Sequence, residues 1–342
     1  MSATTPVFYQ DATRAWGYLE GEALETLRQL PDQCVDAVVV DPPYGIGFHG
    51  ESWDGADILA ATSSRRGMAP AEAFERWNAL WAKECLRVMK PGAHMAAFGS
   101  PRTFHRLVAG VEDAGLEVRD QLLWVFAGGM PKSRLLDGGI SSGLKPAFEP
   151  ILLARRPFAG SLTENVGRHG TGALNIDAAR VPRADYGTGY WPATITASHA
   201  SECTSAACNP ACPVLALDDM CEGKPLSRLF YCAKATRAER DAGCELLPLQ
   251  PVQIYTGKHH LAPLVRNIHP TVKPLDLMRW LVRLITPPGG LVLDAFAGSG
   301  STGAAAVLEH RRFLGIEREG EFVDIACARL THWAKQAGGG SV

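Results

Sequence analysis

The stretch Asp41-Pro42-Pro43-Tyr44 combines residue types that could act on a planar ring carrying an amino group. It follows an apolar run at 35–40, typical of a buried strand, and precedes a glycine-broken segment that indicates a loop. Because the two prolines remove two backbone donors, the local carbonyls are left as acceptors beside the carboxylate and the aromatic ring. Such a corner suits an exocyclic amine. An ordinary proline turn at a strand end is the competing interpretation.

A glycine-rich stretch at 294–303 is the second candidate for chemistry. It follows a short apolar run, and its distinctive residues are Asp294, Phe296, Gly298, Gly300, Thr302 and Gly303. A strand, a glycine turn and a helix start together let backbone N–H groups approach a ligand. Glu317 stands 19 residues after Gly298, at the end of the next expected strand, where it could accept both hydroxyls of a ribose.

Taken alone, the glycine pattern also fits a nicotinamide-dependent oxidoreductase. A phosphate-binding P-loop is excluded because no lysine follows the glycines. Asp294 argues against a dinucleotide, since a carboxylate there would repel a pyrophosphate but attract the ammonium group of a methionine moiety.

The composition predicts a folded, cytosolic protein. The chain has 342 residues, 46% hydrophobic and 20% charged, enough for one large domain with a smaller one inserted or appended. Its formal net charge of -2 gives no overall nucleic-acid signature, so a polyanion would have to be held by a local patch. We expect no secretory signal and no membrane span, and mostly reduced thiols among the nine cysteines.

Strands alternate with helices along most of the chain, which predicts a doubly wound, mostly parallel α/β sheet. Strands are expected at 35–40, 94–98, 121–126, 149–154, 291–293 and 313–316. Helices are expected at 71–89 and 103–117, and a third begins after 269–274. A fourth follows the glycine-rich stretch and ends at about 309, and a last one begins at about 322. Residues 45–70 are expected to form a mobile loop that carries Arg65 and Arg66. Residues 156–266 lack periodicity and are expected to form a separate, irregular domain.

Sheet topology can join the two candidate sites. In a strand order of 3-2-1-4-5, strands 1 and 4 are neighbours, and ligands bind at their carboxyl ends. If 291–293 is strand 1 and 35–40 is strand 4, the glycine loop and the Asp41 corner face each other. The chain would then be a circular permutation of the usual order.

Three motifs in this order resemble the β group of amino-DNA methyltransferases: Asp41-Pro-Pro-Tyr44, His269-Pro-Thr271-Val-Lys273-Pro, and Asp294-x-Phe-x-Gly-Ser-Gly-Ser-Thr302. Intervening segments resemble the prophage-type members, so the resemblance covers nearly the whole chain. It implies a circularly permuted Rossmann-like fold and methylation of adenine N6 or cytosine N4 in double-stranded DNA by S-adenosylmethionine. It also implies a catalytic half at 1–155, a target-recognition domain at 156–266 and a cofactor-binding half at 267–342.

The resemblance also implies residue roles. Asp41 and the Pro42 carbonyl would accept hydrogen bonds from the target amine, and Tyr44 would stack on the flipped base. Thr271 and Lys273 would lie near the methionine carboxylate of the cofactor. The remaining cofactor residues would be Asp294, Phe296, Gly298, Gly300, Thr302 and Glu317, with Glu22 where relatives usually carry aspartate.

Direct transfer to an exocyclic amine requires no covalent nucleophile. Two acceptors would stabilise the positive charge that grows on the amine, and alignment would supply the rest. The sequence contains no Pro-Cys dipeptide, which argues against methylation of a cytosine ring carbon.

Local basic clusters are the candidates for DNA contacts. Besides Arg65 and Arg66, they are Arg180, Arg183, Lys234, Arg237 and Arg240. For Arg237 and Arg240, an equal alternative is a solvent-exposed face on which they pair with Glu239 and Asp241. Four cysteines, Cys203, Cys208, Cys212 and Cys221, lack a C-x2-C pair, so reduced thiols are favoured over zinc and no metal is expected.

The leading hypothesis is an adenine-N6 DNA methyltransferase of a restriction-modification type, because cytosine-N4 relatives more often carry serine at the position of Asp41. Cytosine-N4 methylation, a DNA-binding protein without catalysis and a nicotinamide oxidoreductase are the alternatives. The recognition sequence, an accompanying restriction enzyme and the oligomeric state are left open, with a homodimer among the candidates.

Overall fold

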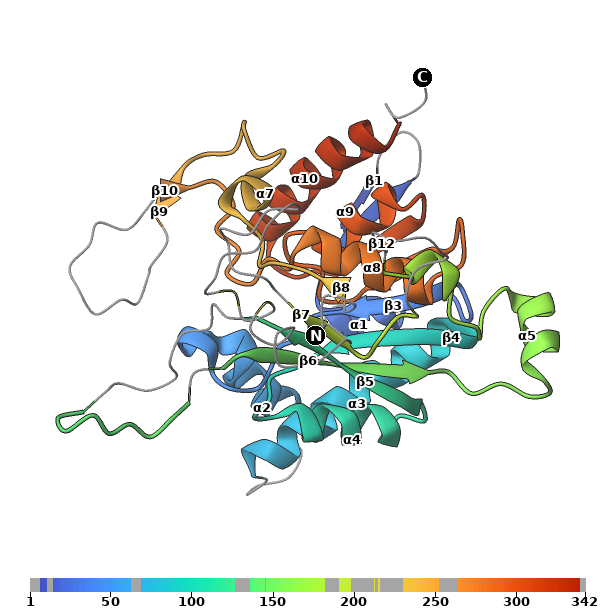
Figure 1. Cartoon of the computed structure of the whole chain (residues 1–342), viewed down its shortest axis with the longest axis horizontal. Helices are drawn as coiled ribbons and strands as arrows, with labels where there is room; N and C mark the ends of the chain where they lie inside the picture. The colour runs from blue at the N-terminus through green and yellow to red at the C-terminus, as the bar shows by residue number, and fades with distance from the viewer. Residues whose placement is uncertain are drawn as a thin grey trace.

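The computed structural model describes residues 7–10, 15–62, 69–126, 136–144, 146–181, 191–197, 212, 215, 230–251 and 264–338. A ten-stranded sheet runs through its centre (Figure 1). In spatial order the strands are β1 (Val7–Gln10), β2 (Trp16–Glu20), β12 (Arg312–Glu317), β11 (Leu291–Asp294), β3 (Val35–Val40), β4 (Met89–Phe98), β6 (Phe148–Arg155), β5 (Glu117–Val125), β7 (Ile195–Ala197) and β8 (Phe230–Tyr231).

The prediction of a mostly parallel α/β sheet is confirmed. β2, β12, β11, β3 and β4 are parallel, whereas β6 runs antiparallel to both β4 and β5, and β1 runs antiparallel to β2. The predicted pairing of strands 291–293 and 35–40 is also confirmed, since Val292 pairs with Ala37 and Leu293 with Val38. The carboxyl ends of β11 and β3 therefore meet at one edge of the sheet.

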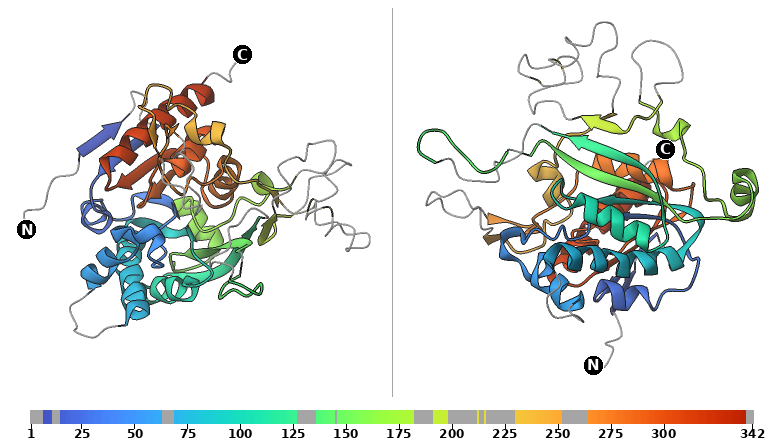
Figure 2. Two further views of the ribbon diagram at one scale, coloured as in Figure 1. Left: turned by 90° about the vertical axis from the view of Figure 1, so that its left-hand side faces the viewer. Right: turned by 90° about the horizontal axis from the view of Figure 1, so that it is seen from below.

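Helices cover both faces of the sheet, which makes three layers (Figures 1 and 2). On one face lie α8 (Leu275–Ile285), α9 (Ser301–Leu308) and α10 (Gly320–Gly338), and on the other α1 (Ala23–Leu27), α2 (Ala56–Thr62), α3 (Pro70–Val88) and α4 (Phe104–Asp113). Further elements are α5 (Leu162–His169), α7 (Arg237–Asp241), and the 3-10 turns η1 (Phe48–Gly50), η2 (Ser52–Asp54) and η3 (Asp177–Ala179).

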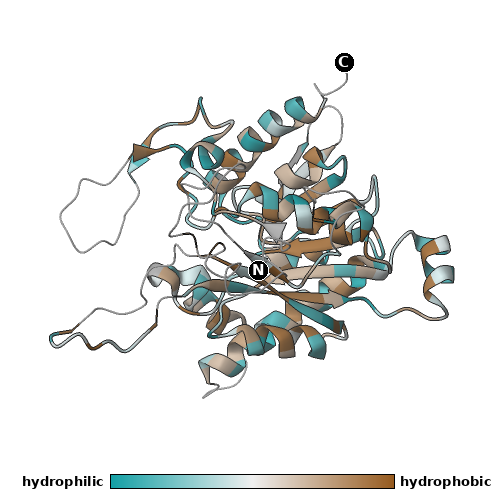
Figure 3. Cartoon of the chain, viewed as in Figure 1, coloured by the Kyte–Doolittle hydropathy of each residue, from teal (hydrophilic) through white to brown (hydrophobic). Residues whose placement is uncertain are grey.

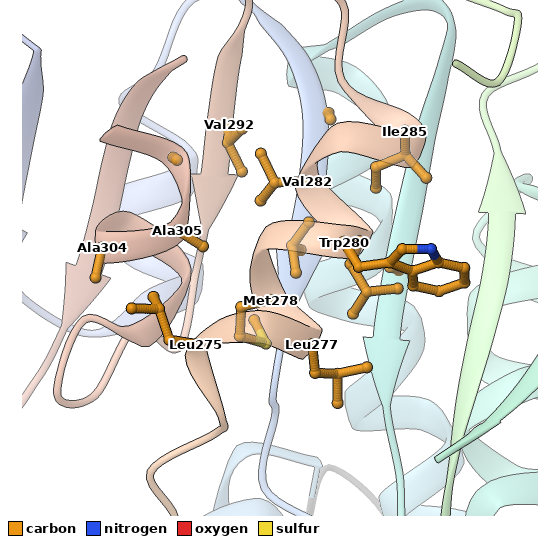
Figure 4. Packing of buried hydrophobic residues seen from close by; sticks show 14 of the residues in the cluster. Leu275, Leu277, Met278, Trp280, Val282, Ile285, Val292, Ala304 and Ala305 are labelled. Atoms are coloured by element: carbon orange, nitrogen blue, oxygen red, sulfur yellow. The ribbon is translucent and has the colours of Figure 1, made fainter. Parts of the chain in front are cut away.

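Alternate residues of a strand face opposite sides of the sheet and so belong to different cores. Ala37 and Val39 of β3 belong to the core under α8 and α9, whereas Val38 and Val40 belong to the core under α3. In the first core, α8 packs Leu277, Met278 and Trp280 toward the sheet and α9 (Figure 4). Apolar residues follow the central strands and polar residues the outer faces of the helices (Figure 3). Because both faces of β3 are buried, its apolar run is nearly continuous.

Expectations about one loop and about helix ends need correction. Residues 45–70, expected to form one loop, include η1, η2 and the helix α2 in their described part. The helix expected to continue to residue 89 ends at Val88, because Met89 already begins β4 and pairs with Val35. Arg65 and Arg66 lie outside the described residues.

The stretch 156–266 is not detached from the sheet where it is described. β7 extends the sheet beside β5, and β8 follows β7. Leu174 and Ile176 pack against the core that contains α8. A small hairpin of β9 (Gln250–Pro251) and β10 (Leu264–Val265) projects away from the body of the molecule (Figure 1). The separation of this stretch as a domain stays a prediction.

No helix in the described ranges is both long and apolar enough to cross a membrane.

Candidate active site

The corner Asp41-Pro42-Pro43-Tyr44 leaves the carboxyl end of β3, where the sequence places it. The Tyr44 hydroxyl donates a hydrogen bond to Asp41 Oδ1 at 2.8 Å and lies 3.3 Å from Glu149 Oε2. The Thr103 hydroxyl donates to the Tyr44 carbonyl at 2.6 Å and holds the backbone of the corner. Burial, together with the Asp41 and Glu149 carboxylates, raises the pKa of Tyr44 well above its usual value, so the phenol stays protonated.

The loop after the corner is organised around one buried carboxylate. Asp54 is fully buried, and its two oxygens accept hydrogen bonds from the backbone N–H groups of Gly45 (2.7 Å), Ile46 (3.1 Å) and Phe48 (2.7 Å). Gly45 has a φ of 67°, in the left-handed region that favours glycine. The segment 45–54 is therefore a compact cap beside the corner.

Asp54→Ala is expected to lower the free energy of unfolding by at least about 2–3 kcal/mol, because three backbone N–H groups lose a buried, charged acceptor. Urea unfolding followed by circular dichroism measures this change. Asp57→Ala is the matched control, since Asp57 pairs with Arg318 at the surface and such pairs contribute about 0–1 kcal/mol. An equal, small effect of both substitutions would show that Asp54 does not organise the loop.

Lys273 lies beside the corner, directly before α8. Its ammonium donates a short hydrogen bond to Asp41 Oδ2, and it is 3.4 Å from the Tyr44 hydroxyl and 3.5 Å from Glu149 Oε2. Burial alone would lower the pKa of Lys273, but the Asp41 and Glu149 carboxylates outweigh it and raise that pKa above the usual value. The resemblance implies a place near the cofactor carboxylate for this lysine, whereas in the structure its ammonium contacts the carboxylate of the corner.

The glycine loop at the end of β11 encloses a second buried carboxylate. Asp294 accepts hydrogen bonds from the Thr302 hydroxyl at 2.5 Å and from the Phe296 N–H at 3.0 Å. Gly300 is the N-cap of α9 with a φ of 76°, and a Cβ atom there would lie 2.5 Å from Leu330. Burial raises the pKa of Asp294 to about 7, despite the opposing hydrogen bonds from Thr302 and Phe296.

Glu317 ends β12 beside this loop. Its Oε2 accepts the Gly298 N–H at 2.8 Å, and its Oε1 accepts the N–H groups of Arg318 and Glu319 at 2.8 and 2.9 Å. Burial raises the pKa of Glu317. A carboxylate oxygen can accept two hydrogen bonds, so Oε2, which accepts only one, keeps acceptor capacity toward a ligand.

One cavity of about 690 Å³ joins these groups. Its lining includes Asp41 and Lys273 from the corner and Asp294, Phe296, Gly298 and Glu317 from the glycine loop and β12. A cavity of this size suits a nucleoside-sized ligand. Thr271, Thr302 and Glu22 also line it, and Glu22 caps α1 by accepting the Glu25 N–H at 2.9 Å.

The same cavity has an aromatic wall. Trp77 of α3 lines the cavity, and its ring centroid lies 5.6 Å from that of Phe296. Trp81 is fully buried, and its ring centroid lies 5.4 Å from that of Phe296. His269 closes another side. Burial lowers the pKa of His269 to about 3, so its ring is neutral.

The chain matches the DNA methylase family model for N6 and N4 methyltransferases over residues 35–328. The chain belongs to this DNA methylase family. It is 25% identical to the type II methyltransferase M.HindIII of Haemophilus influenzae, over 90% of this chain and 93% of that protein. It is 20% identical to M.HinfI of the same species, over 91% of this chain and 67% of that protein.

The solved structure of the PvuII DNA methyltransferase, described as cytosine-N4-specific, shares the fold of this methylase. The TM-score is 0.56 with 16% identity, over 96% of this chain and 94% of that one. Membership in the family removes support for the nicotinamide oxidoreductase.

The basic residues expected to contact DNA have different surroundings in the methylase. Arg237, at the start of α7, is exposed and donates to the Leu264 carbonyl at 2.6 Å. Lys234 lies over the Phe126 ring at 3.8 Å, and Arg180 lies 2.8 Å from Asp177. Arg240 is half-buried and donates to the His269 carbonyl at 2.6 Å, so it holds the backbone of a residue that lines the cavity and does not form a free surface.

Several predicted positions lie outside the described residues, namely Arg183, Cys203, Cys208 and Cys221. Cys212 is buried. Within the described ranges, no group of three or more histidine, cysteine or acidic side chains is placed to hold a metal ion.

Sequence reasoning missed Glu149 and Asp54. Glu149 begins an apolar strand and Asp54 lies among glycines and serines, so neither stands in a recognisable motif. The spacing of Asp54 from Gly45 and Gly47 is the only local signal that could have indicated a capped loop.

Proposed function

We propose that this methylase transfers a methyl group from S-adenosylmethionine to the exocyclic N6 of adenine in double-stranded DNA, with the base flipped out of the helix. The observation that carries the proposal is the single cavity lined both by the Asp41 corner and by the glycine loop with Asp294 and Glu317. A methyl donor and an acceptor amine must meet for direct transfer, and this cavity offers groups suited to each.

The residues of the glycine loop fit S-adenosylmethionine. Asp294 is a buried carboxylate suited to the cofactor's ammonium group, and Glu317 offers acceptors to ribose hydroxyls. Phe296 and Trp77 supply apolar surface for an adenine ring. The cofactor supplies an electrophilic methyl group on a sulfonium. Because that cofactor is cationic, a cavity lined by Asp41, Asp294 and Glu317 suits its charge.

The corner supplies the acceptors. An exocyclic amine is a poor nucleophile because its lone pair is delocalised into the ring. Asp41 and the Pro42 carbonyl can accept its hydrogens and stabilise the positive charge that develops on nitrogen. Flipping the base costs a few kcal/mol, and stacking on Tyr44 would offset about 1–3 kcal/mol of this.

Tyr44→Phe and Tyr44→Ala separate the two expected roles of this residue. The phenylalanine variant keeps the stacking ring and loses the hydroxyl with its hydrogen bonds to Asp41, Glu149 and Lys273, so methyl transfer should fall by a factor of about 3–10. The alanine variant also loses the ring, so kcat/KM for DNA should fall by a further factor of roughly 5–100. Steady-state methylation kinetics measure both. Equal losses in the two variants would contradict stacking by the ring.

Adenine N6 is favoured over cytosine N4 because an aspartate stands at position 41, where resemblance associates serine with the cytosine enzymes. Single-molecule sequencing of DNA from cells that express the protein tests the base and its context together. N6-methyladenine at one motif is the expected result. N4-methylcytosine would show the same mechanism on the other base, and unmodified DNA would favour a binding protein without catalysis.

A target-recognition role for residues 156–266 is part of the proposal, with Arg237 as its best-placed cation because its side chain is exposed.

We also propose that the fold is circularly permuted. The chain passes through β3, β4, β5 and β6 before it reaches the glycine loop after β11, which supports this interpretation.

A further inference from the structure

Both oxygens of Asp41 are engaged in the structure, and the Lys273 ammonium offsets the negative charge of this carboxylate. Its Oδ1 accepts the Tyr44 hydroxyl at 2.8 Å, and its Oδ2 accepts the Lys273 ammonium. Yet the proposed reaction requires this carboxylate to accept a hydrogen from the target amine. Because Lys273 is almost entirely buried, its charge cannot simply move into water when the amine arrives. The ammonium needs a second acceptor within the site.

The carboxylate of Glu149 lies close enough to Lys273 to be this second acceptor. Glu149 begins the apolar part of β6, the strand beside β4, and its Oε2 is 3.5 Å from the Lys273 Nζ and 3.3 Å from the Tyr44 hydroxyl. The Lys273 Nζ therefore lies between two carboxylates, in contact with Asp41 and one small movement away from Glu149. Tyr44 is likewise within hydrogen-bonding distance of both carboxylates.

The surroundings favour a short transfer of the ammonium between the two carboxylates. The Phe98 ring lies 4.9 Å from the Lys273 Nζ and the Tyr44 ring 5.7 Å from it, so aromatic faces flank the ammonium. His269, whose pKa is lowered by burial and by the nearby charge of Lys273, is neutral and does not compete for a carboxylate. One ammonium facing two carboxylates leaves one negative charge, which suits an amine that becomes positive as it reacts.

We propose that Glu149 is a positioning residue that takes over the Lys273 ammonium when the target amine binds, and so frees Asp41 Oδ2 to accept that amine. This inference rests on the proposed methyl transfer. It gives Lys273 two positions, on Asp41 in the empty site and on Glu149 with the base bound. A purely structural Glu149 would instead hold Lys273 in one place throughout.

The first test is Glu149→Gln, which keeps the shape of the side chain but removes its charge. Methyl transfer at saturating S-adenosylmethionine and DNA should fall at least tenfold, because the ammonium stays on Asp41. Binding of S-adenosylhomocysteine, measured by calorimetry, and the melting temperature should match those of the unchanged protein. Glu112→Gln, at an exposed position of α4, is the matched control and should retain full transfer.

The second test is a crystal structure of the full chain with S-adenosylhomocysteine and a duplex containing the methylated motif identified by sequencing. The Lys273 Nζ should be hydrogen-bonded to Glu149 and separated from Asp41. A lysine still on Asp41 beside a flipped base would overturn the inference, as would unchanged transfer by Glu149→Gln. Absence of transfer by the unchanged protein would instead contradict the proposed function.

Discussion

Replacement of Asp41 by asparagine should reduce methyl transfer by a factor of about 100–1,000, the range observed when one preorganised group that stabilises transition-state charge is removed. The amide keeps the size of the side chain, but it loses the negative charge that would stabilise the developing cation on the target amine. In this variant Lys273 can still pair with the carboxylate of Glu149. The loss should appear in kcat, since the charge develops during the reaction.

The measurement is the transfer of a labelled methyl group to unmethylated plasmid DNA. S-adenosylhomocysteine should bind Asp41→Asn within about twofold of its affinity for the unchanged protein, because the Asp294 and Glu317 side of the cavity is intact. Asp113→Asn, at an exposed position of α4, controls for the substitution itself. Asp41→Asn with full activity would contradict the assignment of the catalytic acceptor.

Affinity for S-adenosylmethionine should fall by about 100-fold as the pH is lowered from 8 to 5, given a pKa of about 7 for Asp294. Burial raises this pKa, so the empty site holds a protonated Asp294 below pH 7, whereas the cationic cofactor requires the carboxylate. Binding below pH 7 must therefore release a proton. Affinity rises with pH until the carboxyl is fully ionised and then becomes constant.

Calorimetry in buffers of different ionisation enthalpy measures both the affinity and the number of protons released. Asp294→Asn is the control, because it keeps the size of the side chain but cannot titrate. Its affinity should be low throughout and its pH dependence smaller than that of the unchanged protein. Glu317, whose pKa is also raised by burial, accounts for any dependence that this variant retains. A wild-type affinity independent of pH would contradict the role of Asp294.

Local signals were sufficient for the strand before the corner and for the glycine loop. The apolar run 35–40 became β3 without any shift of its ends, and the two glycine-loop carboxylates lie where the spacing places them. Short-range patterns succeed here because strand burial and glycine turns depend on neighbouring residues. The sequence also predicted which strands would adjoin, since the order of strands in a doubly wound sheet restricts the choices.

Contacts between distant residues were not predictable in this way. Arg240 has the spacing of a surface cation, yet it donates to the backbone of His269, 29 residues away. Trp77 lies in a stretch whose spacing indicates only a helix, and the packing of α3 against Phe296 makes it a wall of the cavity. Residues 45–54 have the composition of a loop, and the Asp54 carboxylate holds their first turn through the N–H groups of Gly45, Ile46 and Phe48.

The sequence by itself determined the fold class, the two chemistry-bearing stretches and the resemblance to amino-DNA methyltransferases, because each depends on residue types at short spacing. Only the tertiary structure decided that Lys273 lies against Asp41 and that Glu149 stands next to both. Lys273 lies 232 positions after Asp41, and Glu149 lies 105 positions after Tyr44. Only the pairing of β3, β4 and β6 and the packing of α8 bring them together. Ion pairs between distant residues follow from that packing, and no local pattern in the sequence encodes them.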